Sequence, residues 1–302
     1  THYSLVDAVC RILKERNCSI IIGDSIAFYQ QGLTRKAFET TLIGETAEKY
    51  GGRLVPFDEE PLVKVQDNLV GLKEIYIPKI LFEADMVVDL CKLKTHGSMR
   101  LSGALKNMFG CLPGGYKQKI HMWTQNPFEL SEVFLDIHNI IKPSVAIMDA
   151  VVSLDGGPSA IGKPVKTSKI LASKNAAAID VAACKITGYD PLDISTLVRA
   201  RARGFIDSFE NVEIIGSIET FEFKKLQKGK ISMEKGTDGI FVTKTFIVPQ
   251  IITSKCIMCG KCLEICPSEA IEKLHGNLSI DNDKCILCYC CIGCCSEYAI
   301  KP

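Results

Sequence analysis

The chain has 302 residues, with 36 Lys and Arg against 35 Asp and Glu, so its formal net charge is +1. A nearly neutral chain has no overall positive field, which argues against nucleic-acid binding through bulk charge. Hydrophobic residues make up 47% and charged residues 24% of the sequence, which is typical of a folded globular protein and excludes disorder as its main property. Charged residues interrupt every long apolar run, so the sequence predicts no membrane span.

Helical and strand patterns alternate along the first two thirds of the chain. The first helix is expected over residues 2–14, because Leu5, Val9 and Ile12 recur on one face. The chain opens at Thr1 rather than at Met, so we expect a further segment before it. The elements expected next are a strand at 19–23, a helix at 34–50, a strand at 86–93, a short helix at 101–109, a helix at 128–141, strands at 145–151 and 168–172, and a helix at 176–187. This alternation predicts the α/β fold class, with a mostly parallel sheet flanked by helices.

A change of composition separates this region from the end of the chain. Residues 221–239 are rich in Lys and Gly and show little periodicity, which favours hairpins or a linker. We therefore place a domain boundary near Pro249. The prediction is an α/β domain at 1–248 and a small C-terminal α+β domain at 249–302.

The C-terminal segment is unusually rich in cysteine. Ten of the 15 cysteines lie between Cys256 and Cys295. A shift of 29 residues aligns Cys256 with Cys285 and Cys266 with Cys295, so the segment is an internal repeat and predicts a pseudo-symmetric module. Such dense spacing, without a secretory signal sequence, favours metal chemistry in a reducing, cytoplasmic compartment over a disulfide framework.

The spacing from Cys256 to Pro267, Cys-x2-Cys-x2-Cys-x3-Cys-Pro, is that of bacterial ferredoxins, in which the fourth cysteine ligates the other cluster. It predicts a ferredoxin-like domain with two [4Fe-4S] clusters. The expected ligands are Cys256, Cys259, Cys262 and Cys295 for the first cluster, and Cys285, Cys288, Cys291 and Cys266 for the second. The second copy departs from the pattern, because Ser296 replaces the proline and Cys290 and Cys294 are surplus.

Two alternatives remain for this module. A pair of zinc sites would also use cysteines, although zinc motifs usually separate their Cys-x2-Cys pairs by about a dozen residues or more. Clusters that serve only the structure are the other alternative. Electron transfer is the favoured interpretation, because this spacing is typical of redox ferredoxins.

In open α/β sheets, ligands bind beyond the carboxyl ends of strands, so residues that follow the expected strands are candidate site residues. Asp24 and Asp149 stand at two such ends, where capping a turn is the simplest role of each. Lys92, Lys94 and His96 alternate, which places them on one face where the strand at 86–93 leaves the core. No G-x-G-x-x-G or Walker A sequence occurs, so nucleotide binding by those motifs is not predicted.

Six Lys and Arg residues and no Asp or Glu occur between Lys92 and Lys119. Within this span Ser102 and Gly103 precede a short helix, whose free N–H groups favour an anion. The alternative is a solvated basic loop. The expected carboxylate or phosphate site contains Lys92, Lys94, Arg100, Ser102, Gly103, Asp24 and Asp149, with His96 and Lys106 as catalytic residues.

Together these residues resemble a known family, the bacterial and archaeal iron–sulfur centre proteins grouped as domain of unknown function family 362. The matching segments are residues 23–25, 92–96, 102–107, 156–158 and 177–180, followed by the cysteine-rich tail. The resemblance covers essentially the whole chain and implies the α/β architecture, the ferredoxin module and a segment before Thr1. A shorter resemblance, carried by His96, Ser102, Gly103 and Lys106, is to the amino-terminal domain of nickel-pincer lactate racemases.

The sequence as a whole predicts an iron–sulfur oxidoreductase. Electrons would pass through two clusters to a small anionic substrate, or to a partner's cofactor, held in the α/β domain. One alternative is an electron carrier or reductive activator of a partner protein, and another is a racemase or isomerase with structural clusters. Net reduction of a substrate, tight binding to a redox protein, and turnover without an electron donor would distinguish the three.

Overall fold

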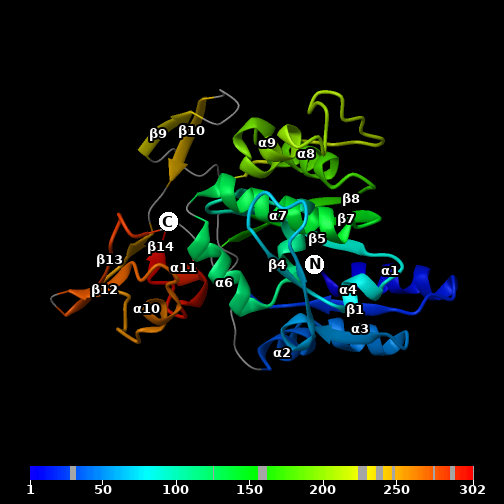
Figure 1. Cartoon of the computed structure of the whole chain (residues 1–302), viewed down its shortest axis with the longest axis horizontal. Helices are drawn as coiled ribbons and strands as arrows, with labels where there is room; N and C mark the ends of the chain where they lie inside the picture. Colours follow the sequence, from blue (N-terminus) through cyan, green and yellow to red (C-terminus); the bar gives the residue numbers. More distant parts are fainter. Residues whose placement is uncertain are drawn as a thin grey trace.

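The centre of the protein, in a computed structural model, is a four-stranded mixed sheet with strand order β6-β5-β7-β8 (Figure 1). Strands β5 (Val88–His96) and β7 (Val145–Asp155) run parallel in its middle. Strands β6 (Arg100–Ser102) and β8 (Lys163–Ser173) flank them and run antiparallel to their neighbours. The structure describes residues 1–27, 32–124, 126–155, 162–223, 230–235, 241–246, 249–274, 276–285 and 290–301.

The predicted α/β fold class is confirmed, and connection lengths explain why the sheet is mixed rather than mostly parallel. Only residues 97–99 separate β5 from β6. A connection this short can join only antiparallel strands, as a hairpin. The parallel pair β5 and β7 is instead joined by a long crossover that contains helices α5 (Ala104–Asn107), α6 (Gly114–Trp123) and α7 (Pro127–Ile141). Parallel pairing requires such a crossover.

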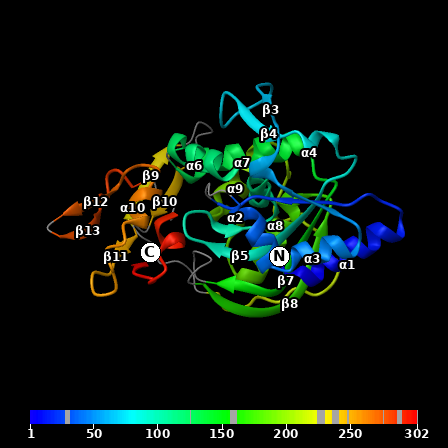
Figure 2. The same ribbon diagram turned by 90° about the horizontal axis from the view of Figure 1, so that it is seen from below.

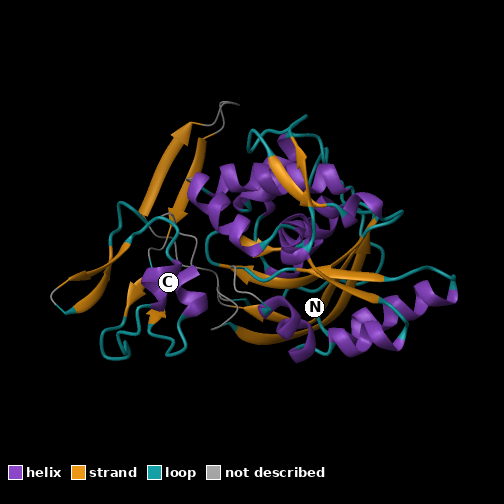
Figure 3. Cartoon of the chain, turned by 60° about the horizontal axis from the view of Figure 1, so that its bottom comes forward, coloured by secondary structure: helices purple, strands orange, loops and turns teal. Residues whose placement is uncertain are grey.

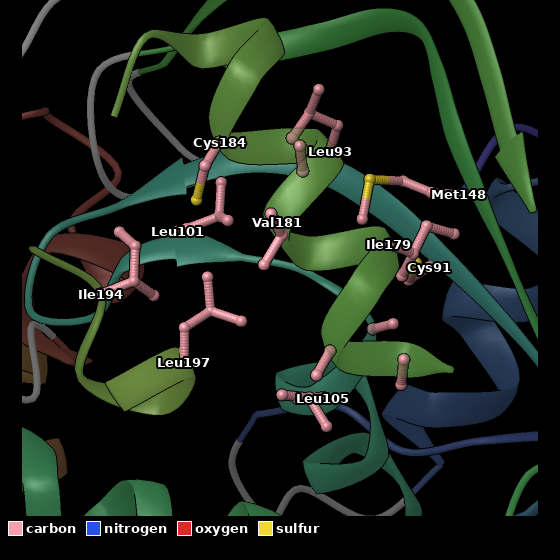
Figure 4. Packing of buried hydrophobic residues seen from close by; sticks show 14 of the residues in the cluster. Cys91, Leu93, Leu101, Leu105, Met148, Ile179, Val181, Cys184, Ile194 and Leu197 are labelled. Atoms are coloured by element: carbon pink, nitrogen blue, oxygen red, sulfur yellow. The ribbon is translucent and has the colours of Figure 1, made fainter. Parts of the chain in front are cut away.

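Helix α8 (Ala176–Thr187) packs against the central sheet, as Figure 4 shows, and coincides with the predicted helix at 176–187. Cys91 and Leu93 of β5 and Met148 of β7 lie in this interface with Ile179 and Val181 of α8, and none is more than 2% exposed. Burial of a large apolar side chain contributes roughly 1.5–3 kcal/mol. This core therefore fixes the orientation of β5, which carries three of the candidate residues.

The N-terminal region forms a smaller layer beside the central sheet. Helix α1 (Tyr3–Glu15) agrees with the predicted first helix, and its residues Val6 and Cys10 pack against Ile20. Strands β1 (Ile21–Asp24) and β2 (Arg53–Pro56) follow as a separate parallel pair. Asp24 thus ends a strand, as predicted.

The single helix expected at 34–50 was a wrong prediction, because the structure contains two helices there, α2 (Leu33–Thr40) and α3 (Ile43–Lys49). The break falls at Leu42, whose φ of 60° is left-handed. The hydroxyl of Thr41 donates to the Ala37 carbonyl at 2.7 Å. Such side-chain hydrogen bonds compete with the helical pattern that apolar periodicity alone predicts.

A second core surrounds helix α7 and includes Phe134 and Leu130. The elements around it are the antiparallel strands β3 (Leu62–Val65) and β4 (Ile75–Pro78), helix α4 (Ile80–Glu83) and helix α6. Helix α9 (Ser195–Ala202) lies against α7, and short 3-10 turns occur at Phe57–Glu59, Met108–Cys111 and Pro191–Asp193. None of the helices in the described ranges is both long and apolar enough to cross a membrane.

The C-terminal segment contains two short helices beside small strand pairs, shown in Figure 3. The antiparallel hairpin β9 (Lys230–Lys235) and β10 (Phe241–Phe246) precedes it. The elements of the segment are β11 (Gln250–Ile251), α10 (Lys261–Ile265), β12 (Ile271–Leu274), β13 (Asn277–Ile280), α11 (Cys290–Cys294) and β14 (Ile300–Lys301). Strand β11 pairs with β14 and β12 with β13, which brings the beginning of the segment next to its end.

The 29-residue repeat found in the sequence is also a repeat of structure. Adding 29 to the bounds of α10 gives the bounds of α11. The backbone N–H of Ala270 donates to Cys266 Sγ, and that of Ala299 donates to Cys295 Sγ, each at 3.3 Å. The two copies therefore fold alike around their fourth cysteines.

Candidate functional site

Strand β5 presents Lys92, Lys94 and His96 on one face. Leu93 and Thr95, between them, are buried in the core, whereas the three candidate residues remain partly exposed. The alternation predicted from the sequence is therefore present. It aims three basic side chains away from the α8 interface.

Two of these residues, Lys94 and His96, join Lys106 and His121 in a group that we call the basic cluster. Burial lowers the pKa of His96 well below its usual value, and repulsion from Lys106, Lys94 and His121 adds to the effect. Burial also lowers the pKa of Lys106 to about 7, with Lys94 and Lys117 repelling its charged form. The pKa of His121 falls to about 4, again through burial and then through Lys106 and Lys117. Mutual repulsion of this kind is characteristic of functional sites and is relieved by a bound anion.

Aromatic side chains support the two members of the basic cluster that come from helices. The Lys106 Nζ lies 5.5 Å from the ring centroid of Phe134. The His121 ring packs edge-on against Phe109, with the ring centroids 5.6 Å apart. Both aromatic rings are buried in the second core. The positions of the two basic groups therefore depend on the packing of α7 and of the 3-10 turn after α5.

His96 is held as a neutral hydrogen-bond donor. Its Nδ1 accepts the backbone N–H of Met99 at 3.3 Å. In a neutral imidazole the other nitrogen then carries the proton, so the hydrogen-bond pattern assigns it to Nε2. Because the pKa of His96 is lowered, this neutral form is the one present near pH 7. The Nε2–H group can donate to a ligand in the basic cluster.

Asp24, at the end of β1, brings an acidic group to the same region. Burial of the carboxyl group within the surrounding protein raises its pKa, against the attraction of Lys117 and Lys94. The Asp24 carboxylate also accepts the N–H of Ser25 at 2.7 Å. The ends of β1 and β5 therefore meet, as the position of sites in α/β folds led us to expect.

Three other predicted site residues are engaged in ion pairs. Lys92 Nζ lies 2.8 Å from Asp149 Oδ2, and the backbone N–H of His2 donates to the same oxygen. Burial opposes the ionised form of Asp149, but the hydrogen bonds from Lys92 and His2 prevail and lower its pKa. Arg100 pairs with Asp193 at 2.9 Å. Each of these charges has a partner within the protein, which argues against a role in holding a substrate anion.

The helix start at Ser102 and Gly103 is likewise filled by the protein itself. The carboxylate of Asp180, in α8, accepts the N–H groups of Ala104 at 2.6 Å and Leu105 at 3.1 Å. The Asp180 carboxyl group therefore occupies the start of α5, where we had expected a substrate anion. A Cβ atom on Gly103 would lie 1.9 Å from Asp180 Oδ1, so only glycine permits this approach.

The end of α5 is held by a second buried carboxyl group, that of Asp89. Asp89 Oδ1 accepts a hydrogen bond from Asn107 Nδ2 at 2.6 Å. Burial raises the pKa of Asp180 to about 7 and that of Asp89 to about 8, and Asp180 contributes to the second shift. Lys106 lies between these two attachments, so Asp89 and Asp180 fix its position from both ends of the helix.

Of the remaining lysines in the basic span, Lys117 is structural and Lys119 is exposed. The Lys117 Nζ donates to the Ser25 hydroxyl at 2.6 Å, to the Ser25 carbonyl at 2.9 Å and to the Ile26 carbonyl at 3.2 Å. These acceptors use all three of its protons. Lys117 therefore holds the loop after β1 and influences the basic cluster through its charge alone.

In the C-terminal segment, one cavity is lined by four cysteines that come from both copies of the repeat. They are Cys256, Cys259, Cys262 and Cys295. Ile251, Leu278 and Ile300 supply apolar lining beside them. Four thiol groups in an apolar cavity are the donor set that a [4Fe-4S] cluster requires, so these residues fit the group.

Among the described residues, no other cysteine lines this cavity. Cys266, Cys291 and Cys294 pack in the same core, whereas Cys288 lies outside the described residues. Within the described ranges, no three His, Cys, Asp or Glu side chains converge on the position of a single metal ion. Burial raises the pKa of Cys294 to about 11, and its thiol donates to the Cys291 carbonyl at 3.3 Å.

The cysteine-rich segment lies beside the basic cluster. Cys290, the first residue of α11, is near enough to Lys106 to oppose the lowering of its pKa. Figure 1 shows α11 beside α6, and in the turned view of Figure 2 the red end of the chain lies on the side of the cysteine-rich segment that faces the α/β region. The two candidate sites therefore adjoin each other through α11.

Comparison with known sequences places these features in a family. Residues 1–185 match the family described as a domain of unknown function, DUF362. The chain belongs to the DUF362 family. Residues 249–272 match the 4Fe-4S binding domain, so the C-terminal segment of this DUF362 protein carries an iron–sulfur cluster. The matched region contains the first cysteine run, from Cys256 to Cys266.

A curated relative of this DUF362 protein is the thylakoid-associated protein sll1697 of Synechocystis sp. strain PCC 6803. It is 26% identical over 205 residues. The aligned region covers 68% of the present chain and 62% of the relative. The present chain therefore matches somewhat less than two thirds of that protein's length.

Three residues of the site were not identified from the sequence. His121 follows Lys117 by four residues, so both lie on one face of α6, and this spacing would have paired them had the helix been predicted. Asp180 belongs to the family resemblance, but the sequence indicates no role for it. Cys290 is a surplus thiol by the spacing of the repeat, and nothing in the sequence indicates that α11 packs near Lys106.

Proposed function

We propose that this DUF362 protein is an iron–sulfur oxidoreductase that reduces a small carboxylate or phosphate compound held in the basic cluster. The observation that carries the proposal is the convergence of Lys94, His96, Lys106 and His121 next to an iron–sulfur segment. Repulsion within this group disfavours its charged forms, and a bound anion would relieve that repulsion. Charge-assisted hydrogen bonds to such an anion contribute roughly 1.5–3 kcal/mol each.

The proposal includes two [4Fe-4S] clusters in a domain at 249–302, which follows an α/β domain at 1–248. The four cysteines that line the cavity would hold one cluster, and Cys285, Cys288, Cys291 and Cys266 would hold the other. The structural repeat supports this assignment, because the fourth cysteines Cys266 and Cys295 occupy equivalent positions. When bound, the clusters supply single electrons. Their thiolate ligands are consistent with a reducing, cytoplasmic location.

The residues of the basic cluster would divide the chemistry among them. Lys94 and Lys106 would bind the anion, and the neutral His96 would donate a hydrogen bond from Nε2. Lys106 is the better proton donor of the group, because a pKa of about 7 lets it exchange a proton near neutral pH. His96 would then stabilise developing negative charge, as a neutral imidazole can. Ser102, Gly103 and Asp180 would position Lys106 through α5.

The experiment is an anaerobic preparation followed by chemical reduction and a screen of oxidants. We expect about eight iron and eight sulfide per chain, with reoxidation by a small carboxylate or phosphate compound. Stoichiometric zinc in place of iron would contradict the cluster assignment. Reoxidation by redox proteins alone would favour an electron carrier, and turnover without a reductant would favour an isomerase.

A further inference from the structure

Helix α5 is held by two acidic side chains that come from different elements. Both oxygens of Asp180, on α8, accept the backbone N–H groups of the first two residues of α5. Asp89 Oδ1, on β5, accepts a hydrogen bond from Nδ2 of its last residue, Asn107. The four residues of α5 span about 6 Å along the helix axis. Two carboxyl groups, Asp89 with 1% and Asp180 with 4% of its surface exposed, therefore share one small region of the core.

The two carboxyl groups differ in their hydrogen bonds. Each oxygen of Asp180 accepts a backbone N–H group, and such bonds favour the ionised form of a carboxyl group. Asp89 Oδ1 accepts one side-chain amide, whereas Asp89 Oδ2 is buried and has no hydrogen-bond partner among the described residues. A charged oxygen in that position costs far more free energy than an unpaired neutral hydroxyl group does. The hydrogen bonds therefore favour a neutral Asp89 beside an ionised Asp180.

The groups that surround Asp89 do not offset a negative charge on it. Asp180 faces it from α8, and two thiols lie nearby, Cys91 on β5 and Cys111 in the 3-10 turn after α5. Burial raises the pKa of both thiols, so they remain neutral. Burial also raises the pKa of Asp89 to about 8; the bond from Asn107 opposes this shift, and the charge of Asp180 adds to it. Within the described ranges, no cation contributes to this pKa.

We propose that Asp89 is a positioning residue that works as a neutral carboxylic acid: it holds the end of α5 through Asn107 and leaves the negative charge beside the helix to Asp180. This inference rests on the proposed function for the importance of Lys106, the neighbour of Asn107, and adds a pH limit to that site. The proton is on Asp89 Oδ2, because Oδ1 accepts the bond from Asn107. Its loss to solvent places two negative charges beside one short helix, so α5 and Lys106 are then held less firmly.

Stability then depends on pH in a defined direction. A carboxyl group whose pKa is raised by folding stabilises the protein fully below its unfolded pKa, about 4, and this contribution is lost as the pH rises to the folded value, about 8. Asp89→Asn keeps an oxygen acceptor for Asn107 but cannot ionise. Between about pH 6 and pH 7, the folding equilibrium constant of the unmodified chain should therefore fall roughly tenfold relative to that of Asp89→Asn. Denaturant unfolding at the two pH values measures this ratio.

The proton itself is observed by infrared difference spectroscopy of the anaerobic protein at about pH 7.5, where exposed carboxyl groups are ionised. The spectrum of the unmodified chain minus that of Asp89→Asn should contain the carbonyl stretch of a protonated carboxylic acid, and Asp180→Asn should retain that band. Asp136→Asn is the matched control, because Asp136 is equally buried but pairs with Arg203 at 2.9 Å. Its removal should leave the band unchanged.

Hydrogen exchange followed by mass spectrometry measures how firmly α5 is held. Between about pH 7 and pH 9, exchange in residues 104–107, corrected for its intrinsic pH dependence, should increase in the unmodified chain. It should increase much less in Asp89→Asn. Helix α7, whose Asp136 is ion-paired, provides the internal reference in both proteins.

Three results would overturn the role of Asp89. One is a difference spectrum without a protonated-acid band, another is a band that Asp180→Asn loses and Asp89→Asn keeps, and the third is the same pH dependence of unfolding or of α5 exchange in Asp89→Asn and the unmodified chain. None of these measurements uses a substrate, so they leave the proposed reduction intact. Failure of the proposed function is recognised separately, by the screen of oxidants with the unmodified chain.

Discussion

The cysteine-rich module and the basic span at Lys92–Lys119 are both short segments rich in one kind of side chain, yet they differ in how a site arises. In the module, the covalent spacing of cysteines brings four of them around one cavity. In the basic span, neighbouring charges separate, with Lys92 pairing with Asp149 and Arg100 with Asp193. The spacing of the cysteines thus defines the cluster site. In the basic span, by contrast, the ion pairs formed on folding determine which residues belong to the site.

The difference has an electrostatic basis. The four thiolates of a cluster site all bind the same iron–sulfur group. Each of their negative charges therefore has a partner in that group. Buried lysines have no such common partner, and each must find an acceptor or lose its proton. Lys117 finds three acceptors, whereas Lys106 has its pKa lowered to about 7. In the basic cluster, burial and then repulsion by neighbouring positive charges lower the pKa values of His96, Lys106 and His121.

The largest effect is expected from breaking the crossed arrangement of the module. Cys266→Ala should remove the cluster of the second run, and Cys295→Ala that of the first, because the fourth cysteine of each run reaches the other cluster. Iron analysis and EPR should each show the loss of about half of the cluster content. Cys290→Ala and Cys294→Ala are the matched controls, and loss of a whole cluster from either would show that the ligand sets are wrong.

A smaller but still large effect is expected within the basic cluster. His96→Ala should lower turnover by about a hundredfold with little change in affinity, because its Nε2–H would act mainly on developing charge. Steady-state kinetics with the substrate found in the oxidant screen would measure this. His138→Ala is the control, because the His138 ring packs edge-on against Phe205, with the ring centroids 5.6 Å apart, on helix α7 rather than on β5. Equal kinetics of both variants would exclude His96 from the reaction.

The close approach of Asp180 to α5 predicts a defect in stability. Gly103→Ala should destabilise the protein by about 1–3 kcal/mol, because the added Cβ displaces the carboxylate that caps the helix. Gly110→Ala is a milder control, since its Cβ would lie 3.2 Å from Asp24 Oδ1. Denaturant unfolding measures both. An unchanged unfolding free energy for Gly103→Ala would mean that Asp180 does not hold α5.

The lowered pKa of Lys106 predicts how anion binding depends on pH. Lys106 is charged below pH 7 and loses its proton as the pH rises through about 7, so affinity for an anion should fall over that range. Between about pH 6 and pH 8.5 we expect a loss of roughly thirtyfold if only the charged form contributes, since the charged fraction falls about tenfold for each pH unit above the pKa. Calorimetric titration would measure this loss, and Lys106→Gln should remove most of it. Affinity that rises with pH would contradict the assignment.

Much of the fold followed from sequence patterns that depend on local packing. Helix α8 agrees with its expected range, and the alternation along β5 placed Lys94 and His96 on one face. The split between α2 and α3 was missed, because apolar periodicity carries no information about the hydrogen bond of Thr41. The sheet is also less parallel than predicted, since residues 101–102 were assigned to the short helix expected at 101–109, whereas they belong to strand β6.

The site was predictable only in part for a similar reason. The sequence shows which residues can carry charge, but not which of them meet an opposite charge after folding. Asp149, Asp180 and Asp193 come from distant parts of the chain and take up groups that we had expected to bind a substrate anion. His121 and Cys290 approach Lys106 through the packing of α6 and α11, which no spacing in the sequence indicates.

The most direct test of the central claim is calorimetric titration of the anaerobic protein with phosphate, acetate and oxalate at about pH 6. The account predicts that at least one of these anions binds to the unmodified chain and to Lys119→Gln with the same affinity. It also predicts that Lys106→Gln binds that anion about tenfold more weakly or worse. Equal affinity in all three proteins, or no binding of any of the anions, would contradict the basic cluster as an anion site.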